Sequence, residues 1–277
     1  MAKAGDSADD DYACMTETPT NDMKTLQWEA ISQDYFQHRP GYPNEFFVLL
    51  QCLGIGMPGQ EILDLGSGTG ALAVPFAKQG AHVTAVDRSE GQIHAGRQAA
   101  QQANVNIVFK VASAEATDLP DHSFDVISAS MCWSYFDMHR MEVEVPRLLR
   151  SSGMLLIASL RWISDDNPVA IQTEKLIAKY NPEANRAARG SRDEIIPAWS
   201  LNSFRLKTYH EFKADLLFSL ESWRGRLRAS KWIGAALSQE QTAAFDREHQ
   251  TLLERISPAQ FNICHRICIQ VFEPIKS

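Results

Sequence analysis

The sequence predicts an α/β fold in three layers, built on a mostly parallel seven-stranded sheet whose last strand is antiparallel. Short apolar runs alternate with amphipathic segments, which is the pattern of repeated strand-helix-strand units. The first apolar run ends in an acid and leads into a turn with three closely spaced glycines, at 66, 68 and 70. The 277 residues suffice for one such domain with an elaborated side.

The parallel part of the sheet is predicted from five apolar runs, at residues 61–65, 82–86, 106–111, 124–129 and 154–159. A helix is expected after the second run, where Ser89 and Gln92 have the spacing of a capping box. Another is expected over residues 138–149, kinked or shortened by Pro146. These connections place the five strands in one parallel sheet.

The carboxy-terminal part predicts a long strand over residues 204–218 and a final strand over 262–272. Between them lies a helical elaboration, residues 219–257, with Ser219 capping a short helix and Ser238 with Gln241 capping a longer one that reaches Ile256. Residues 160–203 interrupt the alternation of strands and helices. We interpret this segment as a lid insertion over the substrate site.

The amino-terminal segment divides near residue 24. Residues 1–23 are rich in Asp, Ser and Thr with little to bury, and we expect an acidic disordered tail. Residues 24–277 form the single domain. A helical pattern begins near residue 25 and stops at residues 38–43, where two prolines forbid its continuation. This break predicts a loop near the site.

The composition and charge of the chain argue against several kinds of binding partner. The net charge is −7 and the basic residues are scattered, which argues against nucleic acid as the substrate. No apolar run approaches the ~18 residues that span a bilayer, so no membrane role is expected. Five cysteines and no apparent signal peptide predict reduced thiols and a cytoplasmic protein. No metal is expected, because His265 would face away from Cys264 and Cys268 in a strand.

The glycine turn alone does not identify its ligand. Glycines let the backbone approach a ligand where a Cβ would clash. Gly66, Gly68 and Ala71 also satisfy the dinucleotide pattern G-x-G-x-x-G/A. Asp87 ends the next strand, where a carboxylate can bind both ribose hydroxyls, and a nicotinamide cofactor would accept that arrangement too.

Three further segments decide between the two cofactors: SAEA at 113–116, LPDHSFDVI at 119–127 and EVPRLLRSSGMLLI at 144–157. In this order they resemble the motifs of the class I, Rossmann-like, S-adenosylmethionine-dependent methyltransferases. The segments RPGYP at 39–43, MCWSYFD at 131–137 and SWRGRLRAS at 222–230 are similar to the trans-aconitate methyltransferase-like group of small-molecule enzymes.

The resemblance implies a set of residues that bind S-adenosyl-L-methionine and release S-adenosyl-L-homocysteine. Asp64 would orient the glycine loop and the cofactor's amino group, Asp87 would take the ribose, and Arg39 or Tyr35 the carboxylate. Ser113 stands where the family often has Asp, which should weaken adenine recognition. The full set is Tyr35, Arg39, Asp64, Gly66, Ser67, Gly68, Asp87, Arg88, Ser113, Ala114, Glu115, Ser130 and Met131.

For the acceptor side, the resemblance and the chemistry predict methyl transfer to an oxygen or nitrogen atom of a small, aromatic or heterocyclic molecule. Trp133 and Tyr135 would wall the pocket, with packing as the alternative, and His210 would serve as base for a phenol. Ser134 replaces the family's His, so a base at that position is not available. We expect the basic residues 224, 226 and 228 to form a solvated face, and a monomer or homodimer.

Three other functions stay open at this point. An NAD(P)-dependent oxidoreductase shares the glycine loop but should lack the SFDVI segment. A methyltransferase acting on RNA or protein shares the cofactor, yet the chain has SMCW rather than an Asn-Pro-Pro-Tyr segment after the fourth strand. A binding module that keeps the fold without turnover would fail to bind the cofactor.

Overall fold

The computed structural model describes residues 31–164, 166–184, 200 and 203–275. They form one seven-stranded sheet in the order β3-β2-β1-β4-β5-β7-β6. The strands are β1 (Glu61–Leu65), β2 (His82–Asp87), β3 (Ile107–Val111), β4 (Phe124–Ser130), β5 (Leu149–Trp162), β6 (Phe204–Ser219) and β7 (Gln260–Pro274). The predicted tail and the start of the first helical pattern lie outside the described residues.

The strand directions confirm the predicted sheet. Strands β1 to β5 pair in parallel, and β7 is antiparallel to both of its neighbours, β5 and β6. Strands β5 and β7 are longer than predicted. Strand β5 begins at Leu149, opposite Phe124, and a register shift follows before its regular pairing with β4. Arg150, Ser151 and Ser152 interrupt the apolar pattern there, which is why the sequence placed the start of the strand later.

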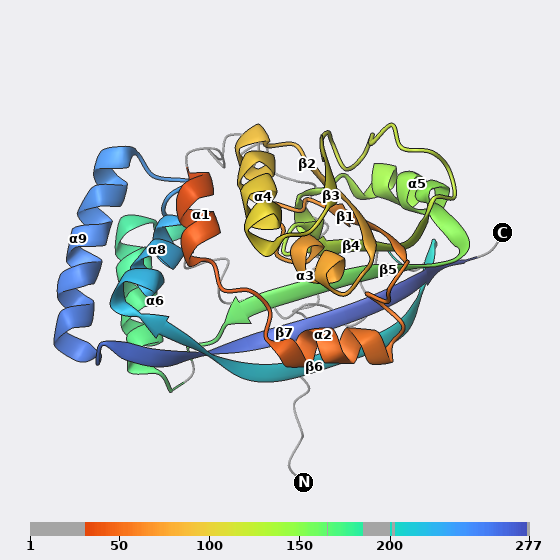
Figure 1. Cartoon of the computed structure of the whole chain (residues 1–277). Helices are drawn as coiled ribbons and strands as arrows, with labels where there is room; N and C mark the ends of the chain where they lie inside the picture. Colours follow the sequence, from red (N-terminus) through yellow and green to blue (C-terminus); the bar gives the residue numbers. More distant parts are fainter. Residues whose placement is uncertain (1–30, 165, 185–199, 201–202, 276–277) are drawn as a thin grey trace, which may run out of the picture.

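Helices cover both faces of the sheet, as the three-layer prediction requires (Figure 1). On one face α2 (Asn44–Cys52) and α3 (Ala73–Lys78) pack on a core that contains Phe46, Phe76 and Leu156. On the other face α5 (Met138–Leu148) packs on a core that contains Val145 and Leu155. The side chains of successive strand residues alternate between these two cores. Helix α4 (Glu90–Ala103) begins at the predicted cap, Ser89.

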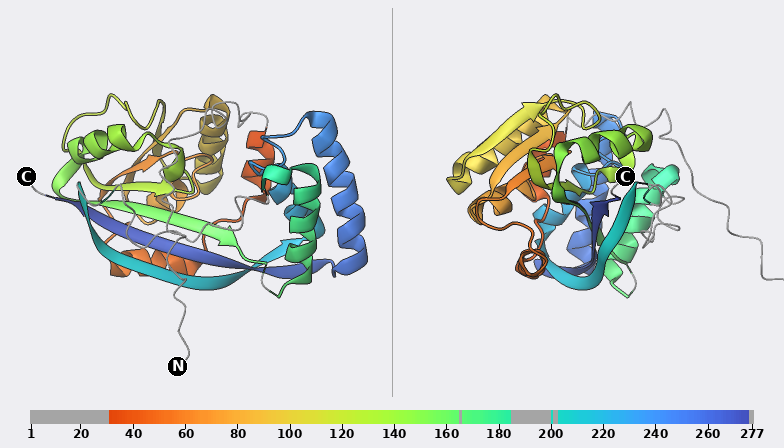
Figure 2. Two further views of the ribbon diagram at one scale, coloured as in Figure 1. Left: turned by 180° about the vertical axis from the view of Figure 1, so that it is seen from behind. Right: turned by 90° about the vertical axis from the view of Figure 1, so that its right-hand side faces the viewer.

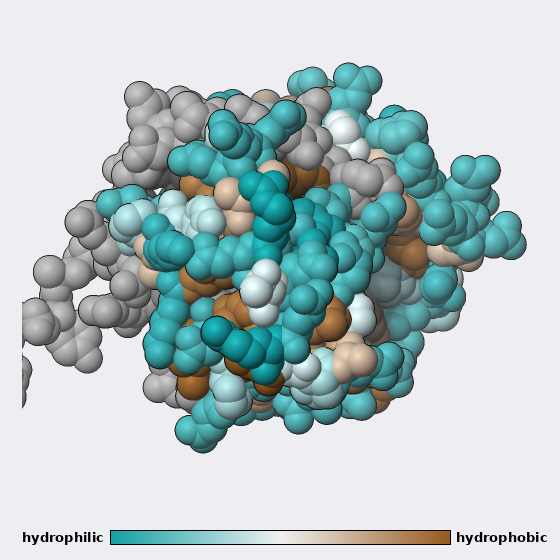
Figure 3. Space-filling model, turned by 90° about the vertical axis from the view of Figure 1, so that its left-hand side faces the viewer, coloured by the Kyte–Doolittle hydropathy of each residue, from teal (hydrophilic) through white to brown (hydrophobic). Residues whose placement is uncertain are grey.

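A third core lies at one end of the molecule, where β6 and β7 extend beyond the parallel strands (Figures 1 and 2). Helices α6 (Pro168–Tyr180), α8 (Leu220–Arg228) and α9 (Gln239–Ile256) surround the buried Trp223 there. Ser219 and Ser238 cap α8 and α9 as predicted, and both caps are complete capping boxes. Figure 3 views this end, and its surface is mostly hydrophilic with small separate apolar patches.

The predicted insertion over residues 160–203 is more regular than the sequence suggested. Helix α6 begins at Asn167, whose side chain accepts hydrogen bonds from the backbone N–H groups of Val169 and Ala170. Proline at the first helical position favours this start, since its missing N–H would be unsatisfied there anyway. Residues 185–199, 201 and 202 lie outside the described part of the chain, so the lid stays a prediction.

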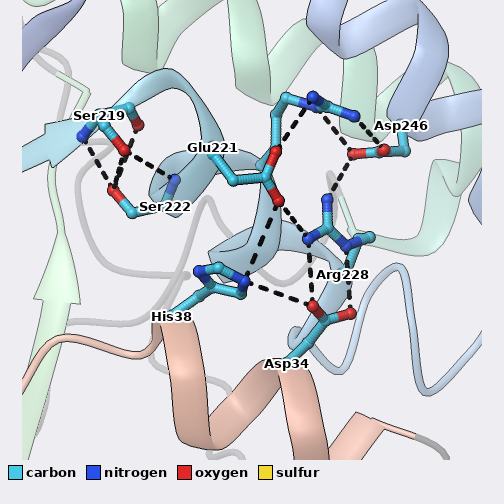
Figure 4. Close-up of polar contacts among 8 residues, drawn as sticks. Asp34, His38, Ser219, Glu221, Ser222, Arg228 and Asp246 are labelled. Atoms are coloured by element: carbon cyan, nitrogen blue, oxygen red, sulfur yellow. Dashed lines mark hydrogen bonds and ion pairs between the residues drawn. The ribbon is translucent and has the colours of Figure 1, made fainter.

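An ion-pair cluster joins α8 and α9 to α1 (Ser32–His38) (Figure 4). Arg228 contacts the carboxylates of Asp34 at 3.1 Å, Glu221 at 2.8 Å and Asp246 at 3.0 Å. Arg224 contacts Glu221 and Asp246 as well. Because these side chains come from three helices, the cluster fixes how the helices sit against one another.

The prediction of a solvated face at residues 224, 226 and 228 is wrong. Arg226 is only 6% exposed, and its guanidinium carbon lies 5.2 Å from the centroid of the Trp162 ring. Arg224 and Arg228 are largely buried by their carboxylate partners. Arg224 and Arg228 are four residues apart and share one face of α8, whereas Arg226 points to another side, so the three could not form one face.

The family-like segment at residues 144–157 has a structural role. Glu144 accepts hydrogen bonds from the Arg147 guanidinium at 2.8 Å and from both the backbone N–H and the hydroxyl of Thr117. The hydrogen bonds from Arg147 lower the pKa of Glu144 to about 2. Arg147 also donates to the Leu119 carbonyl oxygen. These contacts hold the loop after β3 against α5.

Candidate functional site

A pocket lies at the carboxyl ends of β1 and β4, the edge of a parallel sheet where ligands commonly bind. Seven of the predicted cofactor residues line it, from three separate segments of the chain. They are Arg39, Asp64, Gly66, Ser67, Gly68, Ser130 and Met131. The sequence reasoning did not single out five further lining residues, which are Pro40, Tyr42, Ala71, Leu72 and Leu160.

Asp64 is the most deeply buried acid of the pocket, at 2% exposure. Its Oδ1 accepts a hydrogen bond from the Ser128 hydroxyl at 2.7 Å, and the backbone N–H of Ala73 also donates to the carboxylate. Burial nevertheless raises the pKa of Asp64 to about 7, and the charge of Asp87 adds to the shift. A cationic group of a ligand in this pocket would therefore favour the ionised form.

The glycine loop has no room for larger residues. Gly66 has φ +60°, and a Cβ there would lie 2.8 Å from Cys132 Sγ and 3.2 Å from the Phe136 ring. Cys132 donates a hydrogen bond to the Leu65 carbonyl oxygen, and burial raises the pKa of its thiol well above the usual value. The thiol thus stays neutral and serves as a packing partner of the loop.

Ser67 and Asp87 complete the polar part of the loop. The Ser67 hydroxyl is buried and has no hydrogen-bond partner among the described residues. Asp87 Oδ2 accepts from the backbone N–H of Gly68 and Oδ1 from that of Ser89, both at 2.9 Å. Each carboxylate oxygen can accept a second hydrogen bond. Burial raises the pKa of Asp87, although these two N–H groups act against the shift.

The wall opposite the glycine loop comes from β4, β5 and the Pro-rich segment after α1. Met131 has φ +61°, which is uncommon for a residue with a side chain. Its backbone N–H donates to the Ala158 carbonyl oxygen at 3.0 Å. The hydroxyls of Tyr42 and Ser130 lie 2.8 Å apart, and the Tyr42 ring stacks on Phe46. These two hydrogen bonds and the ring contact hold the wall in place, and they keep Met131 in its strained conformation.

The other predicted cofactor residues do not line the pocket. Ser113, Ala114 and Glu115 follow β3, and Arg88 is exposed after β2. Since β2 lies beside β1, β3 lies beside β2 and all three run in parallel, these four residues lie at the same edge of the sheet as the pocket. Ala114 is buried, whereas Ser113 is exposed and its hydroxyl contacts Glu115. Tyr35 lies on α1, but its side chain lies outside the described part of the structure.

The three residues predicted for catalysis lie in different surroundings in the structure. Trp133 is only 8% exposed and packs in the core on the α5 face, edge-on to Phe136, which favours the packing role. Tyr135 is half-buried at the carboxyl end of β4. His210 is not brought to the pocket. It lies on the edge strand β6, with β7 and β5 between it and β4, and it does not line the pocket, so the base role stays a prediction.

A sequence signal existed for three of the five missed residues. Pro40 and Tyr42 belong to the RPGYP segment, which the sequence marked as a loop near the site, and Ala71 completes the dinucleotide pattern of the glycine turn. Leu160 and Leu72 carry no such signal, because an apolar residue in a strand or beside a helix reads as core. Among the described residues, no group of His, Cys, Asp and Glu side chains could hold a metal ion, and no helix is long and apolar enough to cross a membrane.

Comparison with known proteins agrees with this geometry. Residues 62–153 match the model of a methyltransferase domain family. A candidate methyltransferase of Dictyostelium discoideum is 30% identical over 159 residues, which cover 57% of this chain and 58% of that protein. A ubiquinone/menaquinone biosynthesis C-methyltransferase of Vibrio cholerae is 33% identical over 138 residues, covering 48% of this chain and 51% of that protein. The chain thus spans about half the length of the curated relatives it matches.

Among solved structures, a candidate type II methyltransferase from Anaeromyxobacter dehalogenans superposes with a TM-score of 0.59 at 22% identity. The match covers 84% of this chain and 97% of that one. Residues 62–153 thus match a methyltransferase domain and the solved structure shares the fold, in agreement with the class I methyltransferase that the sequence motifs predicted. The trans-aconitate-like subgroup stays a prediction.

Proposed function

We propose that the protein transfers a methyl group from S-adenosylmethionine to an oxygen or nitrogen atom of a small molecule. The observation that carries the proposal is the buried Asp64 carboxylate next to a glycine loop, in a pocket that Arg39 also lines. An amino acid group carries an ammonium and a carboxylate side by side. A pocket with one buried acid and one base is complementary to it.

The polar groups of the pocket fit this cofactor. Asp64 would bind the ammonium group, and Arg39 the carboxylate. The Ser67 hydroxyl, buried without a partner among the described residues, would gain a hydrogen bond. Asp87 has acceptor capacity left for two ribose hydroxyls, and Ala114 and its neighbours lie where the adenine would extend, beyond β2.

When bound, the cofactor would supply a methyl group activated by a sulfonium. The chain's task is then to align the acceptor and exclude water, because an in-line displacement at such a carbon needs little further activation. Met131, Leu160 and Tyr42 provide the apolar wall. With His210 outside the pocket, the proposal assigns no general base, which suits an acceptor that reacts without losing a proton beforehand.

Calorimetric titration with S-adenosylhomocysteine and, separately, with NADH tests the proposed cofactor. We expect S-adenosylhomocysteine to bind and NADH not to bind. Binding of NADH alone would contradict the proposal. Incubating the enzyme with radiolabelled S-adenosylmethionine and a whole-cell extract, followed by separation into small-molecule, RNA and protein fractions, then tests the acceptor class. Label in the RNA or protein fraction would contradict a small-molecule acceptor.

A further inference from the structure

Helix α1 leads directly into one wall of the pocket. Arg39, Pro40 and Tyr42, which line the pocket, follow its last residue, His38. The helix has only seven residues, and an isolated helix of that length is not stable in water. The place of α1, and with it the start of the pocket wall, is therefore set by the surface on which the helix packs. That surface is α8 together with the turn that follows it.

Three residues of one helical face join α1 to this surface. Ile31, Asp34 and His38 are three and four residues apart, which is the spacing of neighbours on one side of a helix. Asp34 accepts two hydrogen bonds from the Arg228 guanidinium, both of 3.1 Å, across 194 residues of the chain (Figure 4). The Nε2 atom of His38 lies 3.6 Å from the Asp34 carboxylate and 4.0 Å from that of Glu221.

Two glycines make room for this contact. A Cβ at Gly225, in the interior of α8, would overlap the His38 ring. A Cβ at Gly234, in the turn after α8, would lie 2.7 Å from the Cγ2 atom of Ile31, which is buried. Glycine is unfavourable inside a helix, because it loses more conformational freedom on folding than any other residue. The close approach of the His38 ring explains the glycine at position 225.

We call this contact the α1 dock. Its residues are Ile31, Asp34, His38, Gly225, Arg228 and Gly234. We infer that the α1 dock positions Arg39 for the carboxylate of the cofactor, which makes Asp34 and Gly225 positioning residues of the methyl-transfer site. The inference rests on the proposed function and adds that binding of the cofactor's amino acid end depends on the helical end of the molecule.

The dock acts through the peptide bond between His38 and Arg39. Successive Cα atoms are about 3.8 Å apart across a trans peptide, so a shift of α1 at His38 moves the Arg39 backbone as well. A charge-assisted hydrogen bond to a carboxylate needs a separation of about 2.7–2.9 Å, and a small displacement of the donor weakens it. The nucleoside part of the cofactor, which the proposal places along Asp87 and Ala114, would be bound as before.

Calorimetry with two ligands tests the inference. S-adenosylhomocysteine carries the amino acid group, whereas 5′-methylthioadenosine has the same nucleoside and sulfur without it. Gly225→Ala puts a methyl group where the His38 ring lies. We expect this variant to bind S-adenosylhomocysteine roughly tenfold or more weakly than the wild type, about the loss of one charge-assisted hydrogen bond. Its affinity for methylthioadenosine should stay within threefold, a distinction that a purely structural role of Gly225 would not produce.

Three further variants separate the dock from the folding of α8. His38→Ala removes the ring that the new methyl group meets, so the double variant with Gly225→Ala should bind S-adenosylhomocysteine within threefold of His38→Ala alone. Asp34→Asn breaks the ion pair with Arg228 without adding atoms to α8, and should weaken S-adenosylhomocysteine about fivefold. Arg224→Met is the matched control, because it breaks the contact of α8 with α9 and should lower stability but keep the affinity within twofold.

The inference is overturned if Gly225→Ala and Asp34→Asn bind S-adenosylhomocysteine as the wild type does. It is also overturned if they weaken methylthioadenosine equally, or if removing the His38 ring does not rescue Gly225→Ala. A wild-type protein that does not bind S-adenosylhomocysteine, or binds it no more tightly than methylthioadenosine, would instead contradict the proposed function.

Discussion

Two regions of the molecule bury carboxylates and treat them in opposite ways. In the glycine-loop region, Asp64 and Asp87 have no Lys, Arg or His within ion-pair distance among the described residues, and burial raises the pKa of both. In the cluster between α8 and α9, Asp246 contacts both Arg224 and Arg228. Burial would raise its pKa as well, but hydrogen bonds and charges of the two guanidinium groups lower it overall.

The difference separates function from structure. A buried carboxylate that is paired stabilises the fold, and removing its charge exposes the partner cation to an unfavourable environment. A buried carboxylate without a cation costs stability, and it is retained where a ligand supplies a charge or hydrogen bonds to it. The glycine-loop acids thus belong to the proposed cofactor site, and the acids of α8 and α9 belong to the scaffold.

Glu144 extends the comparison to a third buried acid. We expect Glu144→Gln to lower the free energy of unfolding by about 3 kcal/mol at pH 7, because Arg147 loses its buried partner. The folded pKa of about 2 lies below the ordinary 4.5, so the stabilisation is present above pH 4.5 and is lost as the pH falls toward 2. Urea unfolding of both proteins at pH 7 and pH 3 measures the difference in the free energy of unfolding and its dependence on pH. If Glu144→Gln is as stable as the wild type at pH 7, Glu144 does not stabilise the fold through its ion pair.

Substitution of Asp87 tests the proposal that the acids of the glycine-loop region bind the cofactor. We expect Asp87→Ala to weaken S-adenosylhomocysteine binding about 100-fold, because ribose hydroxyls would lose charged acceptors in a buried place. Trp133→Ala is the control from the core. The Trp133→Ala change should lower the free energy of unfolding by about 3 kcal/mol and change the affinity for S-adenosylhomocysteine less than threefold. Equal effects of the two changes on calorimetric affinity would contradict the assignment.

The pH dependence of cofactor binding sharpens the role of Asp64. The free protein holds this carboxyl at a pKa of about 7, and an ammonium group of the ligand needs the ionised form. Protonation therefore competes with binding below pH 7, and the affinity for S-adenosylhomocysteine should fall about tenfold from pH 8 to pH 6. Calorimetry at the two pH values measures this change. An affinity that is flat over this range would place the ammonium elsewhere.

Much of the fold followed from local patterns, and the cofactor pocket followed in part. Asp64 and Asp87 could be recognised in the sequence as strand ends because an acid after an apolar run is unusual. The glycine turn could be recognised because the spacing of its glycines is specific. What could not be predicted depended on the path of the chain in space. His210 was expected to serve as a base, and only the structure shows that β7 and β5 lie between it and the pocket.

Arg226 and Lys231 show the same limit for charged residues. A basic residue in a helix or turn is ordinarily solvated, and no local pattern reveals that Trp162 or Tyr135 will cover it. Only the packing of α8 against the sheet decides its burial. The burial of a basic residue is for this reason harder to predict than a turn with closely spaced glycines.

The same substitution at the two contrasting acids tests the central claim most directly. Asp64→Asn and Asp246→Asn each remove one buried charge and keep the shape. With urea unfolding and calorimetry at pH 8, we expect Asp64→Asn to keep at least wild-type stability and to lose S-adenosylhomocysteine affinity at least 30-fold, the loss of a strong charge-assisted contact. Asp246→Asn should lose about 2 kcal/mol of stability and keep the affinity within threefold. Loss of stability in Asp64→Asn with unchanged affinity would contradict the account.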